Sequence, residues 1–397
     1  MLRPPAAARA PRRGRRCGAL LERGLACRRR HAAAGHAPWL RSLSLLHLEL
    51  PGLDCAAAWP ALSRIALDRC AFEDGDSVVD AGPACRELQV VRCTLDQVDV
   101  SRCRAARVLR VTNSRRLQRV EAPPSSRLRS IVLEGNVALQ TFALPHAIVV
   151  DAITINNCAN LAAWAPPTAN DAFFTARQIV VDSCGALQVL DLRRCRGLRT
   201  LAVCRCRGLR KMPLPLSAAG TRPADELVEP EAQDAPELCC IDVRDCRALQ
   251  DLDLSTGIAL RDVTVYHCPA LSEIQLPVVR RHREEGLMGF HRLYVGSCAG
   301  LQSLRVPANC SLQVLEVCDC VHLQDVEVAG SCNTDLRSLD VTRCTSLRGV
   351  VASVCGSLER MRFHHCDRLQ RVVVAARFQQ PRVKFVDCPF ASLHVSN

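Results

Sequence analysis

Cysteine recurs along this chain at a fixed interval. Cys184, Cys195 and Cys206 lie eleven residues apart, and each is followed three residues later by leucine. The same spacing and the same following leucine recur in residues 344–369. Two such intervals make a period of 22 residues, and a regular period of about 20–50 residues is the signature of a protein built from stacked structural units. The chain is therefore predicted to fold as a repeat solenoid, in which each unit contacts only its neighbours.

The segment from Leu187 to Leu209 shows the repeating unit most clearly, because the pattern LxxLxVxxCxxL is written twice there. Before each repeat cysteine, hydrophobic residues such as Leu339 and Val341 alternate with polar ones, and this two-residue period is typical of a β-strand. Like strands recur one unit apart in the same direction, so neighbouring coils should pair in parallel. We expect a solenoid of mainly parallel β-strands with loops or short helices, in a curved or straight array.

The segments Leu312–Leu323 and Leu336–Leu347 resemble leucine-rich repeats, with cysteine where many members of that superfamily have asparagine. The doubled 22-residue period is similar to the short, nested repeats of bacteria and protists. The resemblance covers about residues 85 to 392. It implies a solenoid whose exposed strand face binds other proteins.

The resemblance also implies a role for the repeat cysteines. In the superfamily, the corresponding side chain fills the corner after the strand and forms a ladder along the solenoid. A free cysteine can do this as a small hydrophobe with a weak hydrogen-bond donor, and the total of 25 cysteines is odd. We expect a reduced structural ladder of Cys158, Cys184, Cys195, Cys206, Cys246, Cys268, Cys298, Cys320, Cys344, Cys355, Cys366 and Cys388.

Two other uses of cysteine stay open. An oxidising compartment would favour disulfides, but the start of the chain lacks the apolar core and cleavage site of an export signal. A soft-metal or redox role could use the tight clusters, although none has the paired C-x-x-C spacing of a structural zinc site. These clusters are Cys204/Cys206, Cys239/Cys240, Cys318/Cys320 and His364–Cys366. We expect no bound metal and no cofactor.

Positive charge is concentrated at the start of the chain. Residues 1–41 contain eleven arginines and a single acid, and so account for most of the net charge of +12. We expect residues 1–38 to be a basic disordered tail or a targeting segment. Residues 39–103 should form an irregular N-terminal cap or degenerate repeats. Residues 104–397 should form the leucine-rich-repeat solenoid, with an acidic loop insertion at 217–237.

The distribution of charge and hydrophobicity narrows the range of partners and compartments. The repeats are close to neutral, so we do not expect them to bind nucleic acid. No apolar run is long enough to predict a membrane span. We expect an intracellular, reducing location, with the cytoplasm as the first choice. The mitochondrion is the alternative, because Arg-rich, acid-poor N-termini are typical of mitochondrial targeting.

One strand face is the predicted binding surface. Residues two and four positions before each repeat cysteine should point outward. They are Asp242, Arg244, Thr264, Tyr266, Tyr294, Glu316, Asp340, Thr342, Arg362, His364 and Lys384. The chain has only two tyrosines, and both lie on this face in successive coils. Tyrosine is enriched among the interface residues that contribute most binding energy.

The sequence contains no motif of an enzyme. It has no glycine-rich phosphate loop between a strand and a helix, no His-Glu-x-x-His and no G-x-S-x-G. The leading prediction is a non-enzymatic scaffold for protein–protein interaction. One alternative is a substrate-recognition subunit or secreted effector that acts with a ubiquitin ligase, and another is a redox or metal-binding cysteine-rich protein. Only nine residues follow Cys388, so the last coil should be uncapped and could pair with a second copy.

Overall fold

The structure is a computed structural model of the chain. It describes residues 40–50, 53–54, 59–72, 78–124, 128–145, 148–165, 173–215, 238–257, 259–278, 290–308, 310–329, 336–352, 357–375 and 381–396. Within these ranges the secondary structure consists of β-strands without a helix, and so includes no helix that could cross a membrane. The predicted insertion at 217–237 and the N-terminal segment 1–38 lie outside the described residues.

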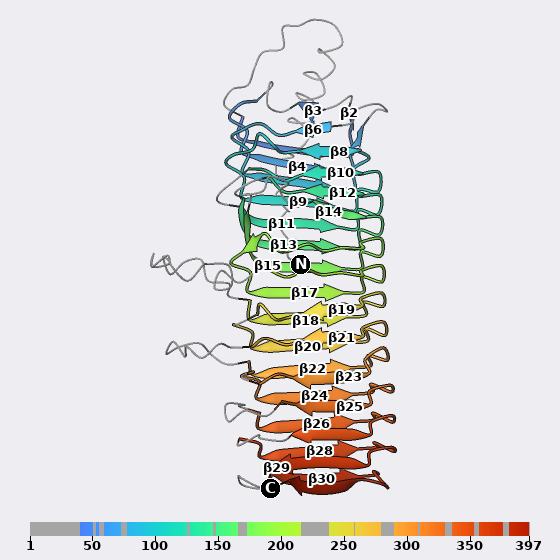
Figure 1. The fold of residues 1–397 in the computed structure, drawn as a ribbon. Coiled ribbons are helices and arrows are strands. Elements are labelled where there is room, and N and C mark those ends of the chain that lie inside the picture. The colour runs from blue at the N-terminus through green and yellow to red at the C-terminus, as the bar shows by residue number, and fades with distance from the viewer. Residues whose placement is uncertain are drawn as a thin grey trace, which may run out of the picture.

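The strands stack into a nearly straight solenoid (Figure 1). One long sheet runs through the whole stack. It contains, in spatial order, β1 (Ser42–Leu46), β4 (Arg64–Asp68), β7 (Glu87–Val91), β9 (Val108–Thr112), β11 (Leu128–Glu134), β13 (Val149–Asn156), β15 (Phe174–Asp182), β17 (Thr200–Cys204), β18 (Cys240–Arg244), β20 (Asp262–Tyr266), β22 (Arg292–Gly296), β24 (Val314–Cys318), β26 (Ser338–Thr342), β28 (Arg360–His364) and β30 (Arg382–Val386), with β16 (Cys195–Arg196) paired to β15.

The remaining strands form shorter sheets from the return segments of the coils. One sheet pairs β2 (Glu49–Leu50) with β5 (Ala71–Phe72). A six-stranded sheet contains β3 (Leu53–Asp54), β6 (Val78–Asp80), β8 (Gln97–Asp99), β10 (Arg119–Glu121), β12 (Thr141–Ala143) and β14 (Ala163–Ala165). A third sheet pairs β19 (Asp251–Asp253) with β21 (Glu273–Gln275). A five-stranded sheet contains β23 (Ser303–Val306), β25 (Asp325–Val328), β27 (Gly349–Ala352), β29 (Arg371–Ala375) and β31 (Ser392–Ser396).

Adjacent coils pair in parallel and in register. Between β24 and β26, Leu315 lies opposite Leu339 and Val317 lies opposite Val341. All four side chains are at most 1% exposed. Burial of such a side chain contributes roughly 1.5–3 kcal/mol, and a single coil cannot bury this face alone. The predicted leucine-rich-repeat-like solenoid of parallel strands is therefore confirmed.

Each long-sheet strand ends at a residue in the left-handed conformation. Fourteen non-glycine residues that directly follow these strands have φ between 51° and 56°. Eight of the fourteen are Asn, Asp or His, the residue types that adopt this conformation most readily after glycine. Their N–H groups continue the ladder, as when Asp319 donates to the carbonyl of Thr342 on the next coil. Every long-sheet strand thus ends at the same register position.

A tight turn after this residue explains the Cys-x-x-Leu spacing. The N–H of Leu323 donates to the carbonyl of Cys320 at 3.1 Å, and Leu347 does the same to Cys344. A hydrogen bond between residues i and i+3 is typical of a β-turn. The cysteine and the leucine at its two ends both point inward and are buried.

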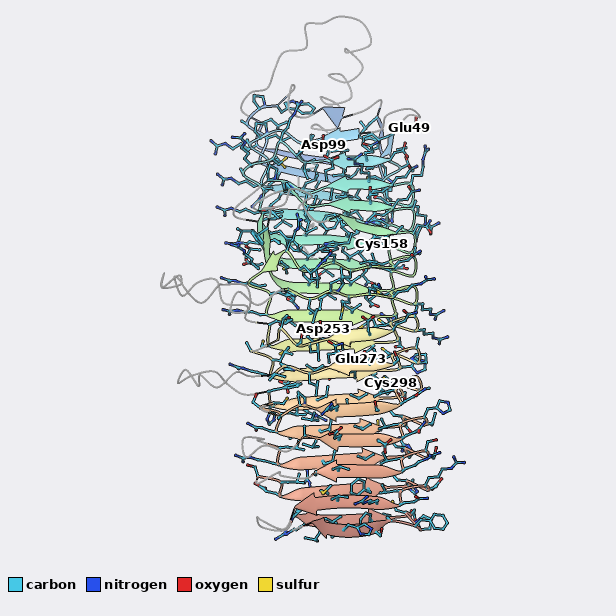
Figure 2. The ribbon with its side chains drawn as sticks, viewed as in Figure 1. Glu49, Asp99, Cys158, Asp253, Glu273 and Cys298 are labelled. Atoms are coloured by element: carbon cyan, nitrogen blue, oxygen red, sulfur yellow. The ribbon has the colours of Figure 1, made fainter. Side chains whose placement is uncertain are left out.

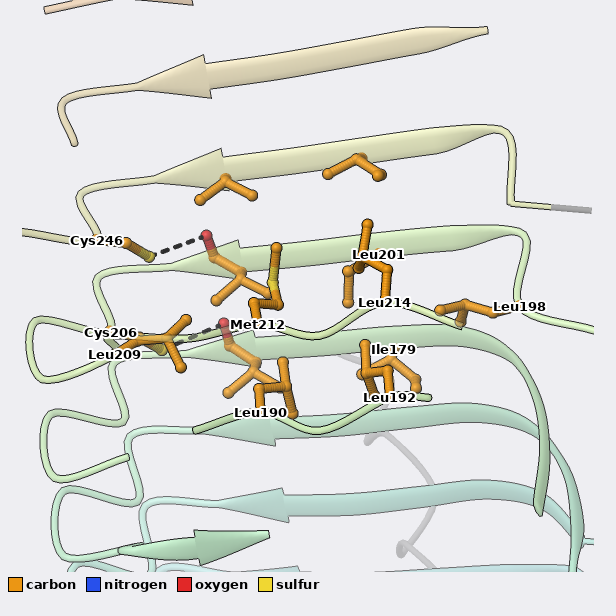
Figure 3. Packing of buried hydrophobic residues seen from close by; sticks show 14 of the residues in the cluster. Ile179, Leu190, Leu192, Leu198, Leu201, Cys206, Leu209, Met212, Leu214 and Cys246 are labelled. Carbon is orange, nitrogen blue, oxygen red and sulfur yellow. Dashed lines mark hydrogen bonds between the residues drawn. The ribbon is translucent and has the colours of Figure 1, made fainter. Parts of the chain in front are cut away.

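The buried thiols form a column on the inside of these corners. The sulfur of Cys206 lies 3.8 Å from the Val181 carbonyl of the preceding coil, and that of Cys246 lies 3.7 Å from the Val203 carbonyl (Figure 3). Cys158 and Cys298, several coils apart, lie along the same side of the stack (Figure 2). Of the described cysteines, fifteen are buried and five are partly exposed, and all are free thiols.

The column differs from the predicted ladder at one described position. Cys195 is buried at the opposite corner, where the chain returns to the long sheet and the N–H of Cys195 donates to the Leu192 carbonyl. The eleven-residue period therefore alternates between the two corners of a coil. Cys388 is in the column but only partly buried, and Cys355 lies outside the described residues.

The column also starts earlier than predicted and includes residues other than cysteine. Cys70 and Cys93 occupy it after β4 and β7, followed by Ser114 and Asn136 after β9 and β11. The Asn136 side chain donates to the Val111 carbonyl at 2.8 Å and accepts from the Ser114 N–H at 2.9 Å. The described part of residues 39–103 thus supplies coils of the same long sheet.

Replacement of Asn136 by alanine should destabilise the solenoid. It would leave the buried Ser114 N–H without the acceptor that Asn136 supplies and would remove one donor from the Val111 carbonyl. A buried polar group without a partner costs about 1–3 kcal/mol. Urea denaturation should show this loss in the free energy of unfolding. Gln140→Ala, at an exposed position of the same coil, is the control. Equal urea resistance of the two variants would contradict this account of the ladder.

Candidate functional site

The predicted binding residues all lie on the outward face of the long sheet, and none is buried. Their strands are β18 (Asp242, Arg244), β20 (Thr264, Tyr266), β22 (Tyr294), β24 (Glu316), β26 (Asp340, Thr342), β28 (Arg362, His364) and β30 (Lys384). Alternation along each strand produces this result, because the residues between them face the core.

Two tyrosines from adjacent coils lie side by side on this face. The rings of Tyr266 and Tyr294 lie 6.5 Å apart between centroids, at an angle of 33°. Tyr266 is 40% exposed, which is high for a large hydrophobic side chain in this solenoid. In the register of the sheet, Gly296 lies opposite Tyr266 on the next strand, and Cys318 lies opposite Gly296 on the strand after that. We refer to Tyr266, Tyr294, Gly296 and Cys318 together as the tyrosine platform.

Gly296 makes room for both rings. A Cβ atom at this position would lie 2.8 Å from Cδ2 of Tyr266 and 3.0 Å from Cε1 of Tyr294. These distances are too short for carbon atoms, which prefer separations of about 3.5–4.0 Å. The absence of a side chain at Gly296 thus lets the two rings lie across the same point of the sheet.

Cys318 holds the polar end of Tyr294. The Tyr294 hydroxyl lies 2.8 Å from the Cys318 sulfur, within hydrogen-bonding distance. Partial burial and this hydrogen bond raise the pKa of Tyr294, and partial burial also raises the pKa of Cys318. Both groups are therefore neutral near pH 7, and the tyrosine platform carries no charge of its own.

Ion pairs surround the tyrosine platform. Arg244 pairs with Asp242 at 2.7 Å, and Arg292 pairs with Glu316 at 2.5 Å. The Arg292 guanidinium lies 6.0 Å from the centroid of the Tyr294 ring, at the outer limit of a cation–π contact. An uncharged aromatic centre with a polar, charged rim is the usual arrangement of a protein-binding surface.

The predicted residues do not all come together at the tyrosine platform. Lys384 lies four coils from Tyr294, roughly 19 Å at the spacing of paired strands. Arg362 and His364 lie three coils away. Three residues close to the rings were not predicted, namely Arg292, Gly296 and Cys318. Their place in the strand register is the signal that could have identified them.

The histidine–cysteine cluster at 364–366 does not place a reactive thiol beside a basic imidazole. Cys366 is fully buried in the column, and burial raises the pKa of its thiol to about 12. His365 instead lies 3.3 Å from Asp387 at the outer corner of the next coil. Among the described residues, no group of three His, Cys, Asp or Glu side chains is placed to hold a metal ion.

The final coil leaves hydrophobic side chains in contact with solvent. Phe390 is 70% exposed, and Leu393 and Val395 are 44% and 45% exposed. The corresponding inward positions of the preceding strand β29, Val372 and Val374, are buried. The predicted exposure of the last coil is therefore present in the structure, and its pairing with a second copy stays a prediction.

Several solved structures of leucine-rich-repeat proteins are similar to this chain. A leucine-rich cell surface protein from Faecalibacterium prausnitzii A2-165 is 12% identical, with a TM-score of 0.25 and coverage of 76% of this chain and 83% of that chain. A leucine-rich repeat protein from Bacteroides ovatus is 13% identical, with a TM-score of 0.31 and coverage of 85% and 87%.

The functional domain of InlJ from Listeria monocytogenes, which includes a cysteine ladder, is 13% identical, with a TM-score of 0.24 and coverage of 80% and 65%. No protein-family model matches the sequence, and no curated protein matches it. The assignment of the fold therefore depends on the strand register and the buried column of this chain itself.

Alanine at position 296 should disturb the tyrosine platform. The added Cβ would collide with both rings, and overpacking of this kind costs about 1–3 kcal/mol. Near-UV circular dichroism should show a changed tyrosine signal, and urea denaturation a lower stability. Gly185→Ala is the matched control, because a Cβ there meets no atom within 4 Å. Identical spectra and stability for the two variants would show that Gly296 is not required for the ring arrangement.

Thiol labelling should distinguish the buried column from the surface. Burial shields the thiols of the column, such as Cys158, and of the return corner, such as Cys195, from a reagent in solution. We expect a maleimide at pH 7.5 to modify Cys204, Cys239, Cys240, Cys318 and Cys388 well before the fifteen buried cysteines. Peptide mass spectrometry with and without urea measures this. Rapid native labelling of the buried cysteines would contradict the packed column.

Proposed function

We propose that this leucine-rich-repeat-like solenoid is a non-enzymatic interaction module that binds another protein through the tyrosine platform and its rim of ion pairs. The pairing of the chain's only two tyrosines over Gly296 is the observation that carries the proposal. Tyrosine residues bury a large area while their hydroxyl groups still form hydrogen bonds, and for this reason they are frequent at binding hot spots.

The rigidity of the array favours this function. The backbones of β20 and β22 are each paired on both sides, so the platform is positioned before a partner arrives. The Tyr294 hydroxyl is already held by Cys318, and the Arg292 side chain by Glu316. Ordering a flexible side chain on binding costs about 0.5–1.5 kcal/mol. Groups that are ordered in the free protein avoid that cost.

The chemistry of the surface defines the partner. The tyrosine platform is neutral, and the neighbouring carboxylates of Asp242 and Glu316 are each paired with an arginine. A strongly charged partner would have to break these pairs. We infer a partner that places an aromatic or aliphatic side chain on the rings and hydrogen-bonding groups around it.

The packing role of the column cysteines needs no disulfide, which is the reason to propose a reducing location for the protein. Many column cysteines from adjacent coils lie close enough for their side chains to interact, as Cys298 does with Cys268 and Cys320. A ladder of free thiols persists in compartments where glutathione and thioredoxin keep cysteines reduced. We therefore propose an intracellular, reducing compartment, with the cytoplasm ahead of the mitochondrion.

Substitution of Tyr266 should weaken partner binding. Loss of an exposed hot-spot tyrosine costs about 2 kcal/mol or more, which is roughly a thirtyfold loss of affinity. The partner is first captured from native cells with the wild-type protein, then purified and titrated against Tyr266→Ala by calorimetry. The control is Arg305→Ala, which removes a long exposed side chain from β23 in the five-stranded sheet, away from the tyrosine platform. A partner that binds Tyr266→Ala as tightly as the control does not use this surface.

A further inference from the structure

A second surface feature lies on the first five coils, far from the tyrosine platform. On each of these coils, one residue just before the paired segment of the long-sheet strand occupies the same register position. These residues form a continuous row along the stack. Backbone hydrogen bonds of 2.7–2.9 Å join Ser63 to Arg41, Arg86 to Ser63, Arg107 to Arg86 and Arg129 to Arg107. Because these residues occupy the same register position, their side chains repeat at about 4.8 Å per coil. We refer to Arg41, Arg86, Arg107 and Arg129 as the arginine row.

The arginine row borders a hollow in the surface. The hollow has a volume of about 300 Å³, and its lining consists of four arginines (Arg41, Arg64, Arg86 and Arg107), two serines and Glu87. This volume is at the lower end of the range found for small-molecule sites, roughly 300–1,000 Å³. The lining contains no aromatic side chain.

Among the described residues, most of the arginines at this hollow have no acidic partner. Glu87, the one acid in the lining, pairs with Arg64 at 3.2 Å. Within the described part of the chain, no carboxylate pairs with Arg41, Arg86, Arg107 or Arg129. Elsewhere on the long sheet, several arginines are matched by acids on adjacent coils, as in Arg92–Asp68 and Arg343–Asp319.

Unmatched like charges at this spacing destabilise a sheet, since charges directly opposite one another on paired strands repel. A bound anion would remove that repulsion. The planar guanidinium groups present paired N–H donors that fit the oxygens of phosphate and sulfate groups. Ser42 and Ser63 add hydroxyl groups to the same lining.

The shape of the feature indicates a chain of anions. The row extends over more coils than a single phosphate or sulfate group could contact, at about 4.8 Å per coil. Single-stranded nucleic acids are usually bound by aromatic side chains that stack on the bases, and this hollow offers none. We propose that the arginine row is a binding site for a linear polyanion without bases, whose charged groups are phosphates or sulfates.

Fluorescence anisotropy with the full chain tests the proposal. The probes are a labelled heparin oligosaccharide, which carries sulfates, and labelled inorganic polyphosphate, which carries phosphates. We expect at least one probe to bind. The variant Arg86→Gln/Arg107→Gln should weaken that binding about tenfold and reduce the slope of log affinity against log salt by about one to two. The probe that responds identifies the source of the charged groups.

The control is Arg210→Gln/Arg348→Gln, which removes the same charge from exposed positions on distant coils. The arginines of residues 1–41 other than Arg41 contribute equally in all variants. Binding of the control should stay within about twofold of wild type, since net charge alone contributes little at physiological salt. Circular dichroism establishes that both variants are folded. The proposal is wrong if neither probe binds or if both variants weaken binding equally. It is also wrong if labelled poly-dT binds as tightly as the better probe and loses binding in the Arg86/Arg107 variant.

Discussion

The contact between inward side chains of adjacent coils is the interaction on which the whole structure depends. A coil of about 22 residues has no interior of its own, so its leucines and valines become buried only against the coils above and below. Val265, Val295 and Val317, on three successive coils, form one such column and are almost completely shielded from water. Register must be kept at every step, because a shift by one residue would turn the hydrophobic positions outward.

The corners maintain this register. A left-handed residue follows each long-sheet strand, and the next residue enters the core. In most coils a β-turn then places a leucine three positions after that core residue. Cysteine, serine and asparagine can all occupy the core position of the corner, because each is small and can hydrogen-bond to backbone. Asn136 forms the strongest bonds of this kind, whereas the thiols combine weak hydrogen bonds with hydrophobic packing. The cysteine column is thus a packing solution and does not by itself imply thiol chemistry.

The fold could be predicted from sequence because its determinants are local. Alternation along a strand and the Cys-x-x-Leu turn both lie within about twelve residues, and they identify the inward and outward positions. Cys70 and Cys93 escaped the pattern because their corners are one residue shorter, with Phe72 and Leu95 two positions after the cysteine. Cys195 fits the pattern but forms the return corner, since the same spacing closes a turn at either side of a coil.

The tyrosine platform shows where local patterns stop being sufficient. Tyr266 and Tyr294 could be placed on the outward face, but their contact depends on how β20 and β22 align across the intervening segment, which lengthens that coil. Only the resulting register brings Gly296 beneath the rings and Cys318 to the Tyr294 hydroxyl. The arginine row is likewise a property of the stack, because its members are more than twenty residues apart in sequence.

The left-handed corners have a consequence for how such a chain can change. An L-amino acid other than glycine in this conformation costs about 1–2 kcal/mol, less for Asn and Asp. Corners such as Arg69, Arg205 and Arg343 carry this cost in separate coils. Each is a site where one codon change to asparagine or glycine could relax the backbone without altering the core. Substitutions at these corners can therefore raise the stability of individual coils. They can compensate for destabilising substitutions on the inward or the outward face of the sheet, although the corners belong to neither face.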